Sequence, residues 1–172
     1  MAGRLGDVFR DRPVLVTGHT GFKGSWLCLW LAALGARVSG YSNHVPTRPS
    51  AFELMRLAND LDDHRGDIGD AEAVLAAMRQ VQPSIVFHLA AQPIVREGFR
   101  NPYATFAANV LGTVAVLEAA RKTPGVEAVV VVTRDKVYDN AGSVWGFREN
   151  DGLGGHEPYG ASKAVAEIVA MT

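Results

Sequence analysis

Short runs of β-branched and other apolar residues alternate along this chain with longer stretches in which apolar residues repeat at helical spacing. Short, continuously apolar runs are typical of strands that are buried on both faces of a parallel sheet. Four such runs are present: Pro13–Thr17, Arg37–Tyr41, Ser84–Leu89 and Ala128–Thr133. A further short strand is expected just before Asp67.

The stretches with helical spacing lie between these runs and predict helices at Gly24–Leu34, Ala71–Gln80 and Pro102–Lys122. The third begins with Asn101 as N-cap and Pro102 at the first helical position, both favoured there. A last helix is expected to begin near Pro158 and to be running still at Thr172. Strands that alternate with helices predict an α/β fold with a doubly wound parallel sheet.

Composition narrows the class of protein. The chain has 172 residues, 48% of them hydrophobic, and a formal net charge of −1, which predicts one globular domain over residues 1–172. The only cysteine, Cys28, lies in an apolar run and is expected to be a buried thiol. No signal sequence and no apolar stretch of roughly 18 residues is apparent, so a cytoplasmic protein without a membrane partner is expected. Dispersed basic residues and scattered histidines argue against nucleic-acid binding and a metal site.

A glycine-rich loop, T-G-H-T-G-F-K-G, joins the first strand to the first helix. Gly18 permits a tight turn, Gly21 allows the backbone to approach a pyrophosphate, and Gly24 lets the helix pack closely while its N-terminus faces the phosphate charge. The alternative is a glycine-rich turn without a ligand. The other candidate cofactor contacts in this loop are His19, Phe22 and Lys23. The G-x-x-G-x-x-G spacing resembles that of short-chain dehydrogenases/reductases.

Other strand ends add candidate cofactor contacts. The residues Tyr41 to His44 contain no carboxylate for an adenosine ribose, so NAD and NADP both remain open. The pair Asp67-Ile68 resembles the adenine-contacting pair of the extended subfamily, with a structural turn as the alternative. Small residues at Ala90 and Ala91 would let a cofactor lie flat. The preceding His88 is expected to be a hydrogen-bonded residue rather than a catalyst.

Tyr159 and Lys163 form a Tyr-x-x-x-Lys motif on the last predicted helix. This spacing brings an ammonium within one turn of a phenol, which favours the phenolate and is expected to lower the Tyr159 pKa from about 10 toward neutrality. Such a phenol could remove a proton from a sugar hydroxyl. The alternative interpretation is a packed tyrosine beside a solvated lysine.

Four stretches together resemble the CDP-glucose 4,6-dehydratases, extended members of the short-chain dehydrogenase/reductase family. These stretches are Gly18 to Leu27, His88 to Arg96, Asp135 to Asn140 and Trp145 to Tyr159. The Asp-Lys pair discriminates best, because related dTDP- and GDP-sugar dehydratases carry an acidic pair there. Members are about twice as long, so we expect an incomplete NAD-binding domain without the C-terminal nucleotide-sugar-binding part. The chain alone is then expected to be weakly active or inactive, and poorly soluble or oligomeric.

The resemblance implies conversion of CDP-glucose to CDP-4-keto-6-deoxyglucose with a tightly held NAD. Tyr159 would take the C4 hydroxyl proton, and Lys163 would hold the phenolate and the nicotinamide ribose. A neutral Lys136 would remove the C5 proton, and a protonated Asp135 would donate to the departing C6 hydroxyl. The alternative for Asp135 and Lys136 is a solvated ion pair. The long helix after Asn101 resembles the dimerisation helix of extended members, so a homodimer is expected.

Arg134 departs from this pattern, because it stands where the family has a Ser or Thr that hydrogen-bonds the sugar. Arginine cannot accept a hydrogen bond. It could lower the pKa of Tyr159 or fill the substrate site. Strand alternation should turn the neighbouring Thr133 to the opposite face. A non-catalytic nucleotide-binding remnant and an NAD(P)-dependent sugar-nucleotide epimerase or reductase therefore remain alternatives.

Overall fold

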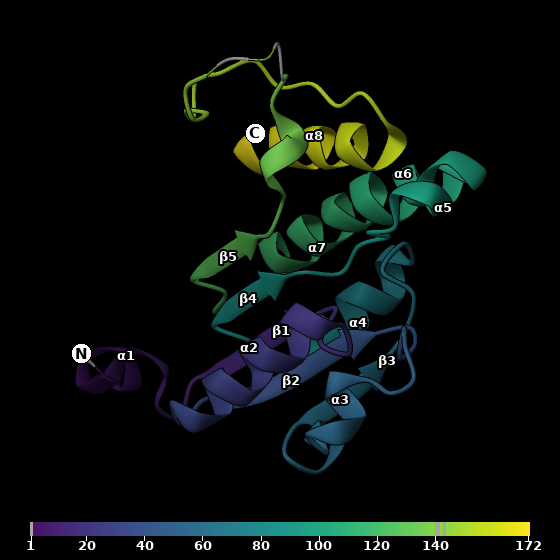
Figure 1. The fold of residues 1–172 in the computed structure, drawn as a ribbon. Coiled ribbons are helices and arrows are strands. Elements are labelled where there is room, and N and C mark those ends of the chain that lie inside the picture. The colour runs from purple at the N-terminus through teal and green to yellow at the C-terminus, as the bar shows by residue number, and fades with distance from the viewer. Residues whose placement is uncertain (1, 140–141, 143) are drawn as a thin grey trace.

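Five parallel strands form one sheet at the centre of the computed structural model, which describes residues 2–139, 142 and 144–172 (Figure 1). The strand order is β3-β2-β1-β4-β5. Their bounds are β1 Pro13–Thr17, β2 Arg37–Ser42, β3 Asp62–Arg65, β4 Ile85–His88 and β5 Ala128–Val131. The chain order reverses between β1 and β4, and ligands of such sheets bind at the carboxyl ends of the strands beside this point. The predicted doubly wound parallel sheet is therefore confirmed.

Alternate residues of the central strands pack against helices on opposite faces of the sheet. Leu15 and Val86 belong to a core with α4 (Ala71–Val81) and α7 (Gly112–Arg121). Val14 and Val16 belong to a second core with α2 (Phe22–Ala33) and α3 (Ala51–Leu54). Cys28 is buried in this second core, as expected, and burial raises the pKa of its thiol to about 12.

The predicted helices are present with small shifts in their ends. The helix α8 (Pro158–Met171) packs on α5 (Val95–Arg100), α6 (Pro102–Phe106) and α7, as Figure 1 shows at the top of the molecule. Short elements that the hydrophobic pattern did not predict are α1 (Ala2–Phe9), α3, α5 and the 3₁₀ turns Leu57–Asn59 and Asp135–Val137. The strand β3 ends at Arg65, so a strand is present just before Asp67, as expected.

The long helix after Asn101 is not a continuous α-helix. The Asn101 side chain caps it by accepting from Ala104 N, as predicted, but a π-helical turn at Ala107–Leu111 separates α6 from α7. Counted together, Pro102–Arg121 is 20 residues long and apolar enough, by composition, to cross a membrane, which corrects the expectation that no stretch would be. Part of its apolar surface packs against α4 and α8.

Candidate active site

The glycine-rich loop leaves β1 and enters α2 at the carboxyl edge of the sheet. Gly18 has a φ of +74°, and a Cβ there would lie 2.7 Å from Ala90 N, so the turn passes directly against the end of β4. A Cβ on Gly24 would collide with Gly18 O. Gly21 is the N-cap of α2 and has no side chain to cap the free N–H groups. Those groups and the exposed Lys23 offer a place for phosphate oxygens.

His19 is turned away from this place. Its ring is fully buried beneath β2, where Nε2 bonds Asp63 Oδ1 at 2.9 Å and Nδ1 bonds Ser42 Oγ at 3.1 Å. The pKa of His19 is lowered, chiefly by burial, although the Asp63 carboxylate acts to raise it. A candidate contact from His19 to a cofactor is therefore limited to its backbone.

The pair Asp67-Ile68 follows β3, and its two residues have different surroundings. Ile68 is buried in the core against α7, and the Asp67 carboxylate accepts from Gly69 N at 2.8 Å in a local turn. The turn considered as the alternative is thus present. Asp67 itself is exposed at the edge of the sheet where a cofactor would lie.

At the end of β4, His88 has the structural role expected of it. Its Nδ1 lies 2.7 Å from Thr17 Oγ1 and its Nε2 lies 3.1 Å from Thr113 Oγ1. The Thr113 hydroxyl donates to Asn109 O, so it accepts from His88, which fixes the neutral tautomer with its proton on Nε2. Burial, with a smaller effect of Lys163, lowers the pKa of His88 to about 3. The following Ala90 and Ala91 are only partly buried and leave room above the strand end.

Asn109 belongs to the site, although sequence reasoning did not identify it as a site residue. It lies in the π-helical turn, is fully buried, and receives a hydrogen bond from Gln92 N at 2.8 Å. Its Nδ2 donates to Gln92 O at 3.2 Å and to Ser162 Oγ at 2.8 Å. This one amide therefore ties the segment after β4 to the helix that carries Tyr159.

Asp135 and Lys136 lie together in the 3₁₀ turn after β5, and both are exposed. The backbone of this turn contacts the first turn of α8, since a Cβ on Gly160 would lie 3.4 Å from Lys136 O. Gly154 N donates to Val137 O at 2.7 Å and holds the turn from the other side. Asn140, at the end of the D-K-V-Y-D-N motif, lies outside the described residues.

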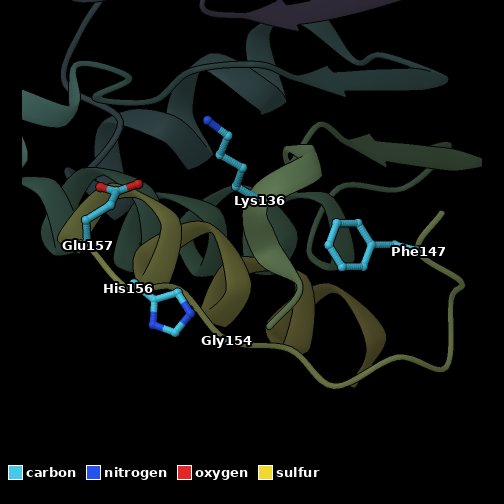
Figure 2. Close-up of a pocket in the computed structure, with 5 residues that line it drawn as sticks. All are labelled: Lys136, Phe147, Gly154, His156 and Glu157. Atoms are coloured by element: carbon cyan, nitrogen blue, oxygen red, sulfur yellow. The ribbon is translucent and has the colours of Figure 1, made fainter. Parts of the chain in front are cut away.

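A shallow cavity of about 180 Å³ opens beside this turn. Figure 2 shows Lys136 extending from the turn, with Glu157 and His156 at the start of α8 and Phe147 on the other side of the turn. Phe147 stacks on Tyr138 at 5.1 Å between ring centres. The candidate base, Lys136, is therefore at the surface of an open depression rather than in a closed pocket, and Asp135 does not line this depression.

Tyr159 lies in the first turn of α8, under the side chain of Arg134. The Arg134 guanidinium carbon is 4.5 Å from the centre of the phenol ring, and Nη1 donates to Glu157 Oε1 at 2.9 Å. The Thr133 hydroxyl donates to Glu167 Oε2 at 2.8 Å, which is also on α8. The expected turn of Thr133 to the opposite face is therefore wrong, because β5 ends at Val131 and strand alternation does not extend to Thr133. The sugar-binding role of the family hydroxyl thus does not pass to Thr133.

The expected lowering of the Tyr159 pKa is wrong for this structure. Burial raises the pKa of Tyr159, and the carboxylates of Glu157 and Asp135 raise it further, whereas the Arg134 guanidinium acts to lower it. Lys163 instead donates to Val132 O at 3.0 Å and is buried. Burial and the nearby Lys23 lower the pKa of Lys163 to about 8.

These charge effects show that residues from the glycine-rich loop, the end of β4 and α8 lie close enough to affect one another's pKa. Lys23 from the glycine-rich loop acts on Lys163, and Lys163 acts on His88 at the end of β4. Residues that could hold a dinucleotide therefore line one edge of the sheet, from the uncapped N-terminus of α2 to Lys163. Among the described residues, no group of three or more His, Cys, Asp or Glu is arranged to hold a metal ion.

Known proteins of similar sequence act on sugar nucleotides. A CDP-glucose 4,6-dehydratase of Salmonella typhimurium is 49% identical over 162 residues, which are 94% of this chain and 45% of that protein. A dTDP-glucose 4,6-dehydratase of Xanthomonas campestris is 32% identical over 164 residues, 89% of this chain and 46% of that protein. The chain thus spans about half the length of the curated relatives that it matches.

Solved structures of similar fold also include enzymes of sugar nucleotides. The UDP-glucose 4-epimerase of Thermus thermophilus, in complex with NAD, is 32% identical with a TM-score of 0.81, covering 92% of this chain and 49% of that one. The UDP-glucose 4-epimerase of Thermotoga maritima, with UDP-glucose, is 26% identical with a TM-score of 0.82, covering 92% and 50%. Residues 15–172 match the family described as GDP-mannose 4,6 dehydratase. The chain therefore belongs to the GDP-mannose 4,6 dehydratase family of sugar-nucleotide enzymes.

Proposed function

We propose that this chain supplies the NAD-binding and proton-transfer groups of a CDP-glucose 4,6-dehydratase. The observation that carries the proposal is the Asp135-Lys136 turn, which contacts the first turn of the helix bearing Tyr159. The 49% identity to a CDP-glucose 4,6-dehydratase supports CDP-glucose as the substrate. A neighbour with bound NAD, together with the uncapped N-terminus of α2, supports NAD as the cofactor.

Each proposed role follows from the chemistry of its side chain. Bound NAD supplies an acceptor for hydride from the sugar C4 and its later return at C6. Tyr159 takes the proton of the C4 hydroxyl, and Lys163 orients the cofactor side of the site. Once C4 is a ketone, Lys136 removes the acidified C5 proton and Asp135 donates a proton to the C6 hydroxyl, which leaves as water. When hydride returns to C6, the protonated Lys136 gives its proton back to C5.

The direct test incubates the purified protein with NAD and CDP-glucose and measures the ultraviolet absorbance of the 4-keto-6-deoxy sugar in alkali. Product from the native protein, and its loss in Tyr159→Phe and in Lys136→Met, supports the proposal. An Arg134→Thr variant in the same assay restores the hydroxyl that the family carries at this position. Failure of native protein and of this variant, both shown to be folded, to bind NAD contradicts the proposal. NAD binding without product does not, because a chain that spans about half the length of its relatives is expected to be weakly active or inactive by itself.

A nucleotide-binding protein without dehydratase activity is the second candidate. The observation that favours it is Arg134, which lies on the phenol ring where the family has a small hydroxyl residue. NAD binding by titration calorimetry without turnover of any CDP- or UDP-sugar supports this candidate. An epimerase or reductase that uses NADP would instead bind NADP more tightly than NAD and leave C6 of the sugar unchanged.

We further propose that two copies associate through the long helix and α8. Apolar side chains are exposed on both, including Leu111 at 58%, Val114 at 43% and Ile168 at 47%. Helices that expose rows of apolar residues are stabilised by a partner. Sedimentation at high protein concentration tests this, and a strictly monomeric species counts against it. A cytoplasmic location stays a prediction from the sequence.

A further inference from the structure

The residue that departs from the family pattern, Arg134, is held on two sides. Only 13% of its side chain is exposed. Its Nη1 donates to Glu157 Oε1 at 2.9 Å, and its guanidinium carbon lies 4.5 Å from the centre of the Tyr159 ring. The planar cation therefore lies between a carboxylate and an aromatic face, an arrangement that suits arginine better than lysine.

Glu157 is itself fixed by the end of the helix. It is the N-cap of α8, and its two carboxylate oxygens accept from Tyr159 N and Gly160 N, each at 2.8 Å. The backbone before Arg134 is tied to the sheet, since Val132 N donates to His88 O at 3.0 Å. The position of the guanidinium on the phenol is thus set by β5 and α8 rather than by a mobile surface contact.

The charges that act on Tyr159 come from two elements, the start of α8 and the turn after β5. Glu157 at the start of α8 and Asp135 in the turn after β5 both oppose ionisation of the phenol, whereas Arg134 favours it. Charged residues on α5, which also packs against α8, are exposed, and among them Arg100 and Glu97 pair with each other at 4.0 Å. The ammonium of Lys163 donates to a backbone carbonyl.

We propose that Arg134 is a positioning residue for Tyr159, in which a guanidinium fixed by Glu157 lies on the phenol ring and stabilises the phenolate form. A small hydroxyl residue at this position would leave Glu157 without its cation and Tyr159 beside two uncompensated carboxylates. The use of ionised Tyr159 as a base in catalysis rests on the proposed function. The contact and its effect on Tyr159 do not, because they are measured without substrate or cofactor.

The test is a pH titration of the tyrosines followed by NMR of protein labelled with ¹³C at the phenol Cζ. The chain has four tyrosines, and the spectrum of Tyr159→Phe assigns the signal of Tyr159. In Arg134→Met the pKa of Tyr159 is expected to rise by about one unit, the lower end of the effect of a nearby charge, because Glu157 partly neutralises the arginine. Arg134→Lys, which keeps the charge but not the planar stacking, should give a smaller rise.

Two further variants serve as a control and as an independent test of the charge effect. Arg121→Met removes an exposed arginine that pairs with Glu118 on α7, and it should leave the Tyr159 titration unchanged. Glu157→Gln keeps an oxygen to cap α8 but removes the charge, so the pKa of Tyr159 should fall. An unchanged or lowered pKa in folded Arg134→Met overturns the proposal. If Arg134→Met does not fold, no rise in the pKa of Tyr159 in Arg134→Lys overturns the proposal in its place.

Discussion

Lys163 offers a sharp test of the electrostatics of this site, through replacement by methionine. The residue is 2% exposed, and burial, with a smaller effect of Lys23, lowers the pKa of its ammonium from 10.5 to about 8. In the unfolded chain the ammonium keeps its proton up to about pH 10.5, whereas in the folded chain it loses the proton near pH 8. Between these values the unfolded state binds more protons, so the stability of the native protein should rise with pH.

The size of this rise follows from the two pKa values. The difference between about 8 and 10.5 corresponds to about 3 kcal/mol, which is the cost of burying the charged lysine at neutral pH. Lys163→Met removes that cost and retains much of the buried volume. It also loses the hydrogen bond to Val132 O, which offsets about 1 to 3 kcal/mol of the gain.

The assay is urea unfolding followed by tryptophan fluorescence at neutral pH and near pH 10. Relative to Lys163→Met, native protein should gain most of about 3 kcal/mol between these conditions. Lys122→Met is the matched control, because Lys122 is an exposed residue that pairs with Glu118 and should show the native pH dependence. Parallel pH dependence in native protein and Lys163→Met would refute the reasoning, since it would mean that the buried lysine titrates as in the unfolded chain.

Two other predictions concern the loop and the strand end. Gly24→Ala places a Cβ against Gly18 O, so it should cost about 1 to 3 kcal/mol of stability in urea unfolding. It should also weaken NAD binding, as measured by calorimetry. In the control Gly146→Ala a Cβ meets nothing within 4 Å, so stability and NAD binding should both stay unchanged. His88 has a pKa lowered to about 3, against 6.5 in the unfolded chain, so stability is complete above about pH 6.5 and should fall by about 1.4 kcal/mol per pH unit as pH drops toward about 3. The same loss in His88→Gln, measured by acid unfolding, would contradict that assignment.

Most of the sheet could be predicted because its strands are apolar runs that are buried on both faces. The strand β3 is different, since its sequence D-D-H-R is polar, and only its place before Asp67 indicated it. The short helices α3 and α5 have four and six residues, too few for a helical pattern to be recognised.

The tight turn of the glycine-rich loop was predicted correctly because backbone geometry determines it, whereas the direction of the Tyr159 pKa was predicted incorrectly because side-chain contacts determine it. Glycine positions fix the turn between β1 and α2, so Gly18 and Gly24 could be assigned from spacing. The spacing of Tyr159 and Lys163 fixes their separation along the helix, but not the carbonyl that Lys163 contacts or the carboxylate that caps α8. The direction of the Tyr159 pKa depends on those contacts and could not be derived from the motif.

The π-helical turn at Ala107–Leu111 sets α6 and α7 in different rotational phases about one axis. One additional residue in a turn rotates everything beyond it by about 100° relative to an uninterrupted α-helix. Deleting a single residue there would restore regular winding and would turn either Asn109 away from Gln92 or Val116 away from the core. The length of this helix is therefore as constrained as its composition, and a one-residue deletion in it would be felt both at the strand end and in the hydrophobic interior.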